Sequence, residues 1–116
     1  MRVAAPFALY SPVAMDAIVV KAPTSLGIET RALFRRQALE ALESLRGSEA
    51  ARQLVIDLTS TRAVDSAGLG VLVLVQRRAA EVRASVRLSG ASEEVRYLLV
   101  MTRLDDRFII ESAPPS

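Results

Sequence analysis

LVIDLTSTRAVDSAGLGVLVLV, residues 54–75, decides the fold because it joins two apolar runs through a polar turn. The first run, residues 54–58, is short and apolar enough to form a strand that is buried on both faces. The second run, residues 67–82, has a periodicity that fits a buried strand or a buried helix. Asp65 and Ser66 can cap a helix, and residues 76–81 extend the run beyond the usual strand length, so a helix is favoured.

Upstream of this stretch the pattern predicts a strand, a loop and a helix. Residues 17–21 (AIVVK) form the strand because of their β-branched side chains, and residues 22–27 form the loop. Apolar residues at helical spacing predict an amphipathic helix over residues 30–46, with Thr30 as its N-cap and Gly47 just after its last turn. The expected buried stripe of this helix consists of Phe34, Ala38, Ala41, Leu42 and Leu45.

Downstream of it the alternation continues, which predicts an α/β layer structure with a largely parallel sheet. Ser92 caps a third helix, whose first turn carries two glutamates that suit the helix dipole. The other predicted elements are an edge strand over Val3–Tyr10, a strand over Ser85–Leu88, a turn at Ser89-Gly90, a turn at Asp105-Asp106, a last strand over Arg107–Ile110 and a frayed tail over Ala113–Ser116.

The composition describes one domain, residues 1–116, with few means of catalysis. Half of the residues are hydrophobic (51%), and the formal net charge is only +2, which together predict a folded chain. With no Cys and no His, the sequence excludes disulfides, thiolate or imidazole metal sites and the common nucleophile–base pairs. We therefore expect a protein that is not an enzyme and needs no cofactor.

The same composition gives little sign of nucleic-acid or membrane binding. The arginines are scattered along the chain rather than clustered in a stripe with aromatic residues, so direct nucleic-acid binding is not predicted. The longest apolar run, residues 69–75, is far below the ~20 residues of a membrane span. The expectation is a cytoplasmic protein.

One turn carries the candidate functional residues: Asp65, Ser66, Ala67, Gly68, Leu69 and Gly70. It lies between a predicted strand and a predicted helix, where α/β proteins bind ligands and partners. A hydroxyl at the start of a helix is next to unpaired N–H groups and can carry a phosphate. A purely structural interpretation stays open, in which Ser66 caps the helix and the glycines only form a tight turn.

Other motifs do not fit this turn. A third glycine and the later acidic residue of a dinucleotide fingerprint are missing, and no lysine follows for a phosphate-binding loop. A nucleophile elbow requires a glycine on the N-terminal side of its serine, and Ser66 lacks one. It also has no histidine to activate it, so a serine hydrolase is the weakest alternative. Asp57 and Asp65 alone are weak evidence for a Mg²⁺ site.

LVIDLTSTRAVDSAGLGVLV, followed by RLSGASEEVRYLLVMTRLDDRFII, resembles the STAS domain of anti-sigma factor antagonists. The resemblance covers about residues 54–110, in the order in which the family has these pieces. It implies an α/β fold with a small mixed, largely parallel sheet of four or five strands and helices mainly on one face. In the family, the serine directly after the aspartate is phosphorylated by a partner kinase, and Ser66 occupies that position here.

The function that this resemblance implies is bacterial partner switching in transcription regulation. The unphosphorylated chain would bind an anti-sigma factor serine kinase through residues 65–70. Phosphorylation at Ser66 would turn the chain into a phosphoprotein and release it from the kinase. A phosphatase would restore the first state. An alternative is a STAS accessory subunit that binds the ATPase of a lipid-trafficking ABC transporter, since D-S-A-G-L also occurs in that setting.

The sequence departs from the family pattern at three places. The N-terminal G-E-L-D turn is replaced by residues 22–27, in a loop that lies near the phosphorylated serine in the family. Arg103 stands where the family usually has glycine before L-D. Little sequence follows Ile110 to form the usual C-terminal helix, so we expect a partner or a second copy, in a homodimer, to cover a sheet face.

Overall fold

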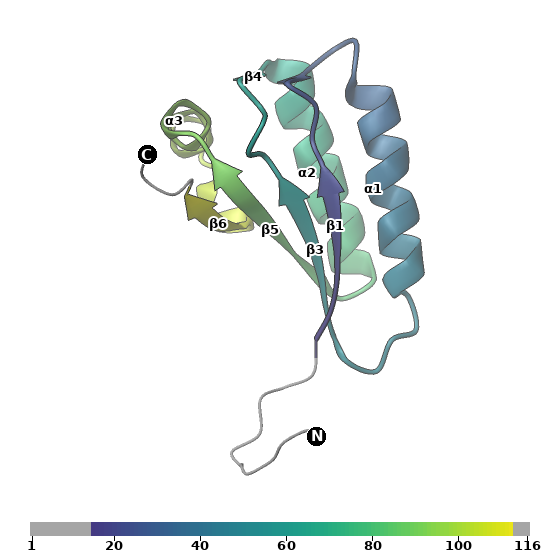
Figure 1. Cartoon of the computed structure of the whole chain (residues 1–116). Helices are drawn as coiled ribbons and strands as arrows, with labels where there is room; N and C mark the ends of the chain where they lie inside the picture. Colours follow the sequence, from purple (N-terminus) through teal and green to yellow (C-terminus); the bar gives the residue numbers. More distant parts are fainter. Residues whose placement is uncertain (1–14, 113–116) are drawn as a thin grey trace.

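The computed structural model describes residues 15–112, which form an α/β sandwich of two layers (Figure 1). One layer is a sheet of four parallel strands in the order β1-β3-β5-β6. Their bounds are Met15–Lys21 for β1, Ala51–Asp57 for β3, Ala84–Ala91 for β5 and Ile109–Ser112 for β6. The predicted fold class is confirmed, and in the described part of the chain this sheet is wholly parallel.

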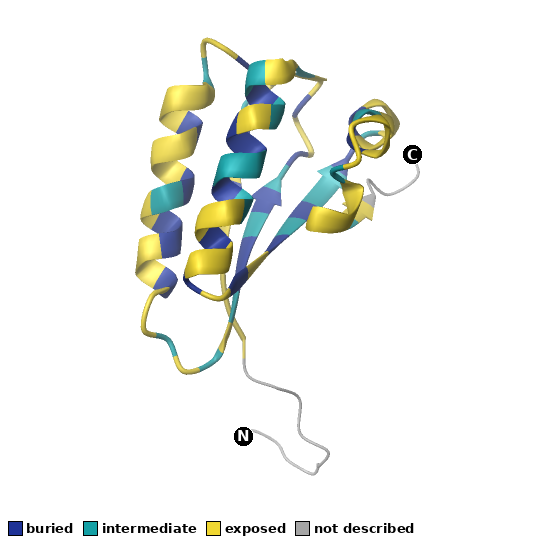
Figure 2. Ribbon diagram, turned by 180° about the vertical axis from the view of Figure 1, so that it is seen from behind, coloured by how far each residue is buried: buried dark blue, intermediate teal, exposed yellow. Residues whose placement is uncertain are grey.

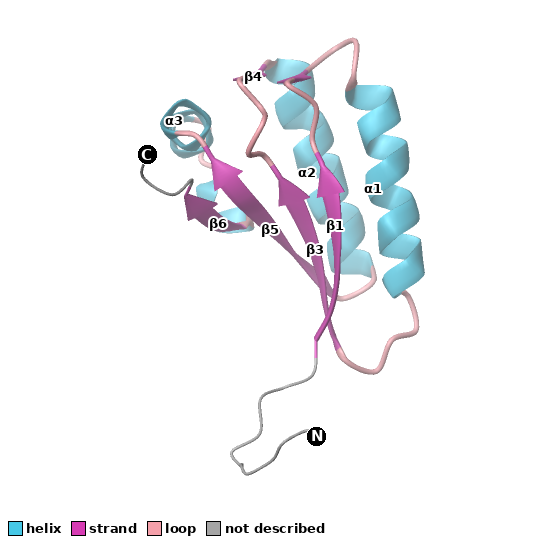
Figure 3. Ribbon diagram, viewed as in Figure 1, coloured by secondary structure: helices cyan, strands magenta, loops and turns pink. Residues whose placement is uncertain are grey.

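Helices form the other layer, as Figure 3 shows by colour. Helix α1 (Arg31–Leu45) connects β1 to β3, α2 (Ser66–Glu81) connects β3 to β5, and α3 (Glu93–Met101) precedes a short 3₁₀ helix, η1 (Asp105–Arg107). Because the strand order follows the chain order, right-handed crossovers place successive helices on the same side. Helices α1 and α2 stand side by side over one face of the sheet (Figure 2).

The core lies between this helix pair and the sheet. All five residues of the predicted α1 stripe are buried, which confirms the helical spacing. Opposite them, Leu54 and Ile56 of β3 and Leu88 of β5 are fully buried. The ambiguous run after Ser66 is a helix, as favoured, and it buries Val71, Leu72, Val75 and Ala79 in the same core.

The opposite sheet face is not covered by any helix of residues 15–112 (Figure 1). One row of side chains crosses that face in register, from Val19 through Val55 and Arg87 to Ile109. Val19 and Ile109, at its two ends, are exposed. The predicted Val3–Tyr10 strand and the Ala113–Ser116 tail lie outside the described residues.

Three local predictions need correction. Ser89-Gly90 is not a turn: β5 runs through it to Ala91, with a register shift against β6 and a positive φ of 73° at Gly90. Residues 22–27 are not all loop, because β2 (Ser25–Leu26) pairs in parallel with β4 (Ala63–Val64). Residue 107 ends η1 rather than starting the last strand. Each error involves a short feature, a bulge, a two-residue strand pair or a single 3₁₀ turn, that is too short to leave a periodic pattern.

The helix boundaries follow from capping. Ser92 accepts a hydrogen bond from the Val95 amide, as predicted, and Gly47 follows α1 with a φ of 87°. Thr30 does stand at the N-cap of α1, but its hydroxyl binds the preceding loop, donating to the Ser25 carbonyl at 2.7 Å. None of the helices among the described residues has the length and apolar character needed to cross a bilayer.

Candidate functional site

Asp65 is the residue that starts α2. Its Oδ1 accepts a hydrogen bond from the Gly68 amide at 2.8 Å, which is the usual N-cap interaction. Its Oδ2 accepts from the Ile28 amide at 3.3 Å, and its own amide donates to the Leu26 carbonyl at 3.2 Å. One side chain therefore caps α2 and ties the loop before α1 to this helix end.

Ser66 is the first residue of α2 and is exposed. Because Asp65 provides the cap, the interpretation of Ser66 as the capping residue is wrong. Among residues 15–112 the Ser66 hydroxyl forms no hydrogen bond with another residue. The hydroxyl is thus accessible at the positive end of the helix dipole, in surroundings that favour an anion.

The glycines of the turn serve different purposes. A Cβ on Gly68 would lie 2.1 Å from the Leu26 carbonyl oxygen, so this glycine lets β2 approach α2. The close approach that Gly68 allows is therefore made by the protein's own backbone, and Gly68 itself is buried. A Cβ on Gly27 would collide with the Asp65 carboxylate. A Cβ on Gly70 would meet nothing within 4 Å.

Both candidate acidic residues have a lowered pKa. The amide of Gly68 holds the pKa of Asp65 below its ordinary value. Desolvation is the next largest effect and opposes this lowering of the pKa, and the amides of Ile28 and Ala67 and the Arg31 charge add smaller contributions to it. The hydroxyl and amide of Thr59 lower the pKa of Asp57 in the same way. Each carboxylate is thus engaged in a local turn. In the described part of the chain no cluster of metal-ligating side chains is present.

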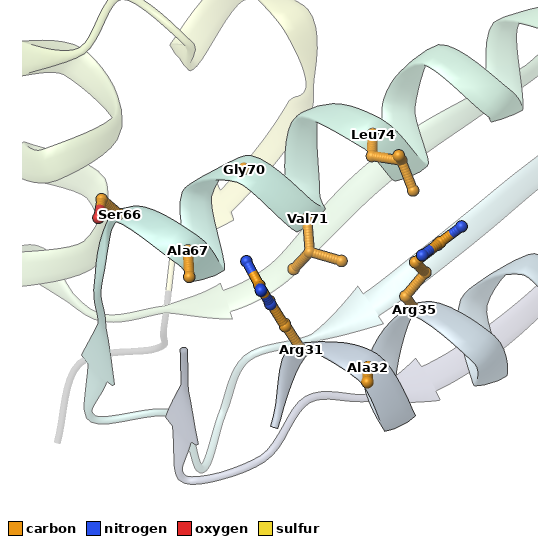
Figure 4. Close-up of a pocket in the computed structure, with 8 residues that line it drawn as sticks. All are labelled: Arg31, Ala32, Arg35, Ser66, Ala67, Gly70, Val71 and Leu74. Carbon is orange, nitrogen blue, oxygen red and sulfur yellow. The ribbon is translucent and has the colours of Figure 1, made fainter. Parts of the chain in front are cut away.

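A groove of about 500 Å³ runs between the N-terminal parts of α1 and α2 (Figure 4). Ser66 lies at one end of it, and small or aliphatic side chains form its floor. Two arginines of α1 extend toward α2 in the same view. The lining residues are Arg31, Ala32, Arg35, Ser66, Ala67, Gly70, Val71 and Leu74.

The structure adds residues to the predicted site and shows that the predicted residues differ in exposure. Of residues 65–70, Asp65, Ser66 and Gly70 are exposed, whereas Ala67 and Leu69 are half-buried. The additions are Ile28, whose amide donates to the Asp65 carboxylate, and Arg31 and Arg35, which line the groove from α1. Ile28 is 67% exposed, which is unusual for its type. No spacing rule links residues 28–35 to residue 66, so only the fold could identify them.

Solved structures with the same fold include two described as anti-sigma factor antagonists. A putative one from Thermotoga maritima is 23% identical, with a TM-score of 0.69, over 88% of this chain and 86% of that chain. An anti-sigma-factor antagonist (STAS) domain protein from Planctomyces limnophilus is 20% identical, with a TM-score of 0.71, over 89% and 90%. Identities this low show the shared fold alone.

A third similar structure comes from another setting. A sulfate transporter family protein from Wolinella succinogenes is 12% identical, with a TM-score of 0.63, over 88% of this chain and 80% of that chain. No curated protein matches the sequence. The family model described as "Mlab, STAS domain" matches residues 13–111. With this match over nearly the whole chain and the same fold in STAS structures, the protein belongs to the STAS domain family.

Proposed function

We propose that this chain is an anti-sigma factor antagonist, which binds an anti-sigma factor serine kinase and is released when Ser66 is phosphorylated. The observation that carries the proposal is the accessible Ser66 hydroxyl at the first position of α2. Since Asp65 caps the helix instead, Ser66 can be modified without loss of that cap. The chain would be a binding protein that transfers nothing itself.

The modification is a phosphoryl transfer from ATP held by the kinase. The Ser66 oxygen would form a bond to the γ-phosphorus while the bond from that phosphorus to the ADP oxygen breaks. The hydroxyl proton would pass to a base of the kinase. The product carries about −1.5 to −2 charges and three acceptor oxygens at the start of α2.

Two opposing energies determine what this charge does. Inside the domain, the helix N-terminus favours an anion by ~0.3–1 kcal/mol, so the fold should survive. At an interface the same charge loses water, which costs several kcal/mol unless a partner cation meets it. A penalty of about 4 kcal/mol lowers affinity by roughly a thousandfold. Release of the partner is therefore the expected result.

The test is incubation of the protein with ATP radiolabelled at the γ-phosphate and with candidate anti-sigma kinases encoded beside its gene. Label on wild type and none on Ser66→Ala supports the proposal. Label that persists on Ser66→Ala assigns the modification to another residue and contradicts it. Turnover of an ester substrate by the protein alone would indicate a hydrolase instead.

A second candidate function is that of a STAS accessory subunit bound to the ATPase of a lipid-trafficking ABC transporter. Residues 65–69 read DSAGL, as in STAS domains of that kind, and the matching family model is described by the name Mlab rather than as an antagonist. Stable co-purification with such an ATPase, without label on Ser66, would favour this candidate. The homodimer and the cytoplasmic location stay predictions under both candidates, and the phosphatase stays a prediction of the first.

A further inference from the structure

Gly70 has no internal reason to be glycine. It lies inside α2, where glycine destabilises a helix relative to alanine because it loses more backbone freedom on folding. Packing requires Gly68 and Gly27, whose Cβ atoms would collide with neighbours, but a Cβ on Gly70 would stand in open space. Gly70 also lines the groove between α1 and α2 (Figure 4). The free space above it can admit a side chain from outside.

The polar wall of this groove carries only positive charge. Arg31 and Arg35 are one helical turn apart on α1, so both lie along the same side of the groove. Neither arginine forms an ion pair within residues 15–112, and no acidic residue lines the groove. The carboxylate of Asp65, the residue before Ser66, is already bonded to the amides of Gly68 and Ile28.

The backbone of α1 and α2 favours a helix over an extended peptide as the segment bound in the groove. Beyond the first turn of each helix the N–H and C=O groups are bonded within the helix, so most of the groove wall offers an extended peptide no partners for its own backbone. A helix brings its backbone groups already paired and can seat its side chains between those of α1 and α2. Acidic side chains one turn apart on that helix would match the spacing of Arg31 and Arg35.

We infer that the groove between α1 and α2 is the docking site for an acidic amphipathic helix of the protein partner. That helix would rest against Gly70 and pair its carboxylates with Arg31 and Arg35. The inference rests on the proposed function, since both require a protein partner, and it adds the chemistry of the contact. Because Ser66 ends the same groove, a phosphate there would repel the acidic helix and compete for Arg31.

The test uses two synthetic helical peptides of eighteen residues that share one leucine and alanine face. The first carries Glu and the second Lys at the polar positions beside that face. By fluorescence anisotropy we expect the Glu peptide to bind wild type at least tenfold more tightly. Arg35→Glu should abolish this preference. Its matched control is Arg36→Glu, which changes the net charge equally on a neighbouring residue that does not line this groove.

Gly70→Ala gives a second, independent readout. It should weaken binding of the Glu peptide at least fivefold and yet raise the melting temperature, so that unfolding cannot explain the loss. Equal affinity for the two peptides, or equal effects of Arg35→Glu and Arg36→Glu, would overturn the inference. The peptide assay needs no kinase, so Ser66 labelling without peptide preference would reject the groove alone, and the reverse result would reject the kinase alone.

Discussion

Asp65 and Ser66 are adjacent in sequence but have separate tasks. The aspartate is bonded to the amides of Gly68 and Ile28 and so holds the turn together. The serine, on the first residue of the helix, is left accessible. The two roles differ because of the positions of the residues at the helix start. An N-cap side chain turns back toward the helix amides, whereas the next side chain points outward.

The first prediction concerns the titration of Asp65. Its pKa is lowered in the folded protein by the Gly68 amide, so its contribution to stability is complete above about pH 4 and is lost as the pH falls through the lowered value. Asp65→Asn keeps an acceptor at the N-cap but does not titrate. Between pH 6 and pH 2 we therefore expect wild type to lose more of its melting temperature than Asp65→Asn. An equal loss of melting temperature in wild type and in Asp65→Asn would show that this carboxylate is not bonded as described.

The second prediction separates the two glycines of α2. Gly68→Ala should destabilise the protein by about 1–3 kcal/mol, because the added methyl group collides with the backbone of Leu26 and β2 must move. Gly70→Ala is the matched control in the same helix and should stabilise by about 0.5–1 kcal/mol. Urea denaturation of both variants measures the difference. A neutral Gly68→Ala would mean that β2 does not pack against α2.

At the scale of elements, long periodic segments could be predicted and short bridges could not. The five buried residues of α1 and the helical nature of α2 follow from spacing, capping and length. The β2–β4 pair joins two residues to two others across a separation of 38 positions, which leaves no local pattern. The β2–β4 pair brings Ile28 close to the turn at residues 65–70. The contribution of Ile28 to the site could therefore not be predicted from the sequence either.

Element ends also hold strain that a substitution can release. Arg103 follows the last turn of α3 with a φ of 60°, in the left-handed region that favours glycine, and it stands where the family usually has glycine. Arg103→Gly should stabilise the protein by about 1 kcal/mol. Arg103→Ala removes the same charge but keeps the Cβ, so it should give no comparable gain. Equal unfolding free energies for the two variants would refute the strain.

At the scale of the whole molecule, one helix pair protects the core and also forms the proposed binding surface. The buried stripes of α1 and α2 face the sheet, while the groove and Ser66 lie on the outer side (Figures 2 and 4). Under the proposed function, we therefore expect a charge added at Ser66 to change the outer surface and leave the packed layer intact. This separation would let the modification act on binding rather than on folding.

The measurement that tests this account most directly compares the protein before and after stoichiometric phosphorylation of Ser66. Affinity for the kinase partner is read by titration calorimetry, and the melting temperature is read on the same samples. We predict that affinity falls at least a hundredfold while the melting temperature is unchanged or slightly higher. Unchanged affinity, or a fold that melts once phosphorylated, would contradict the account.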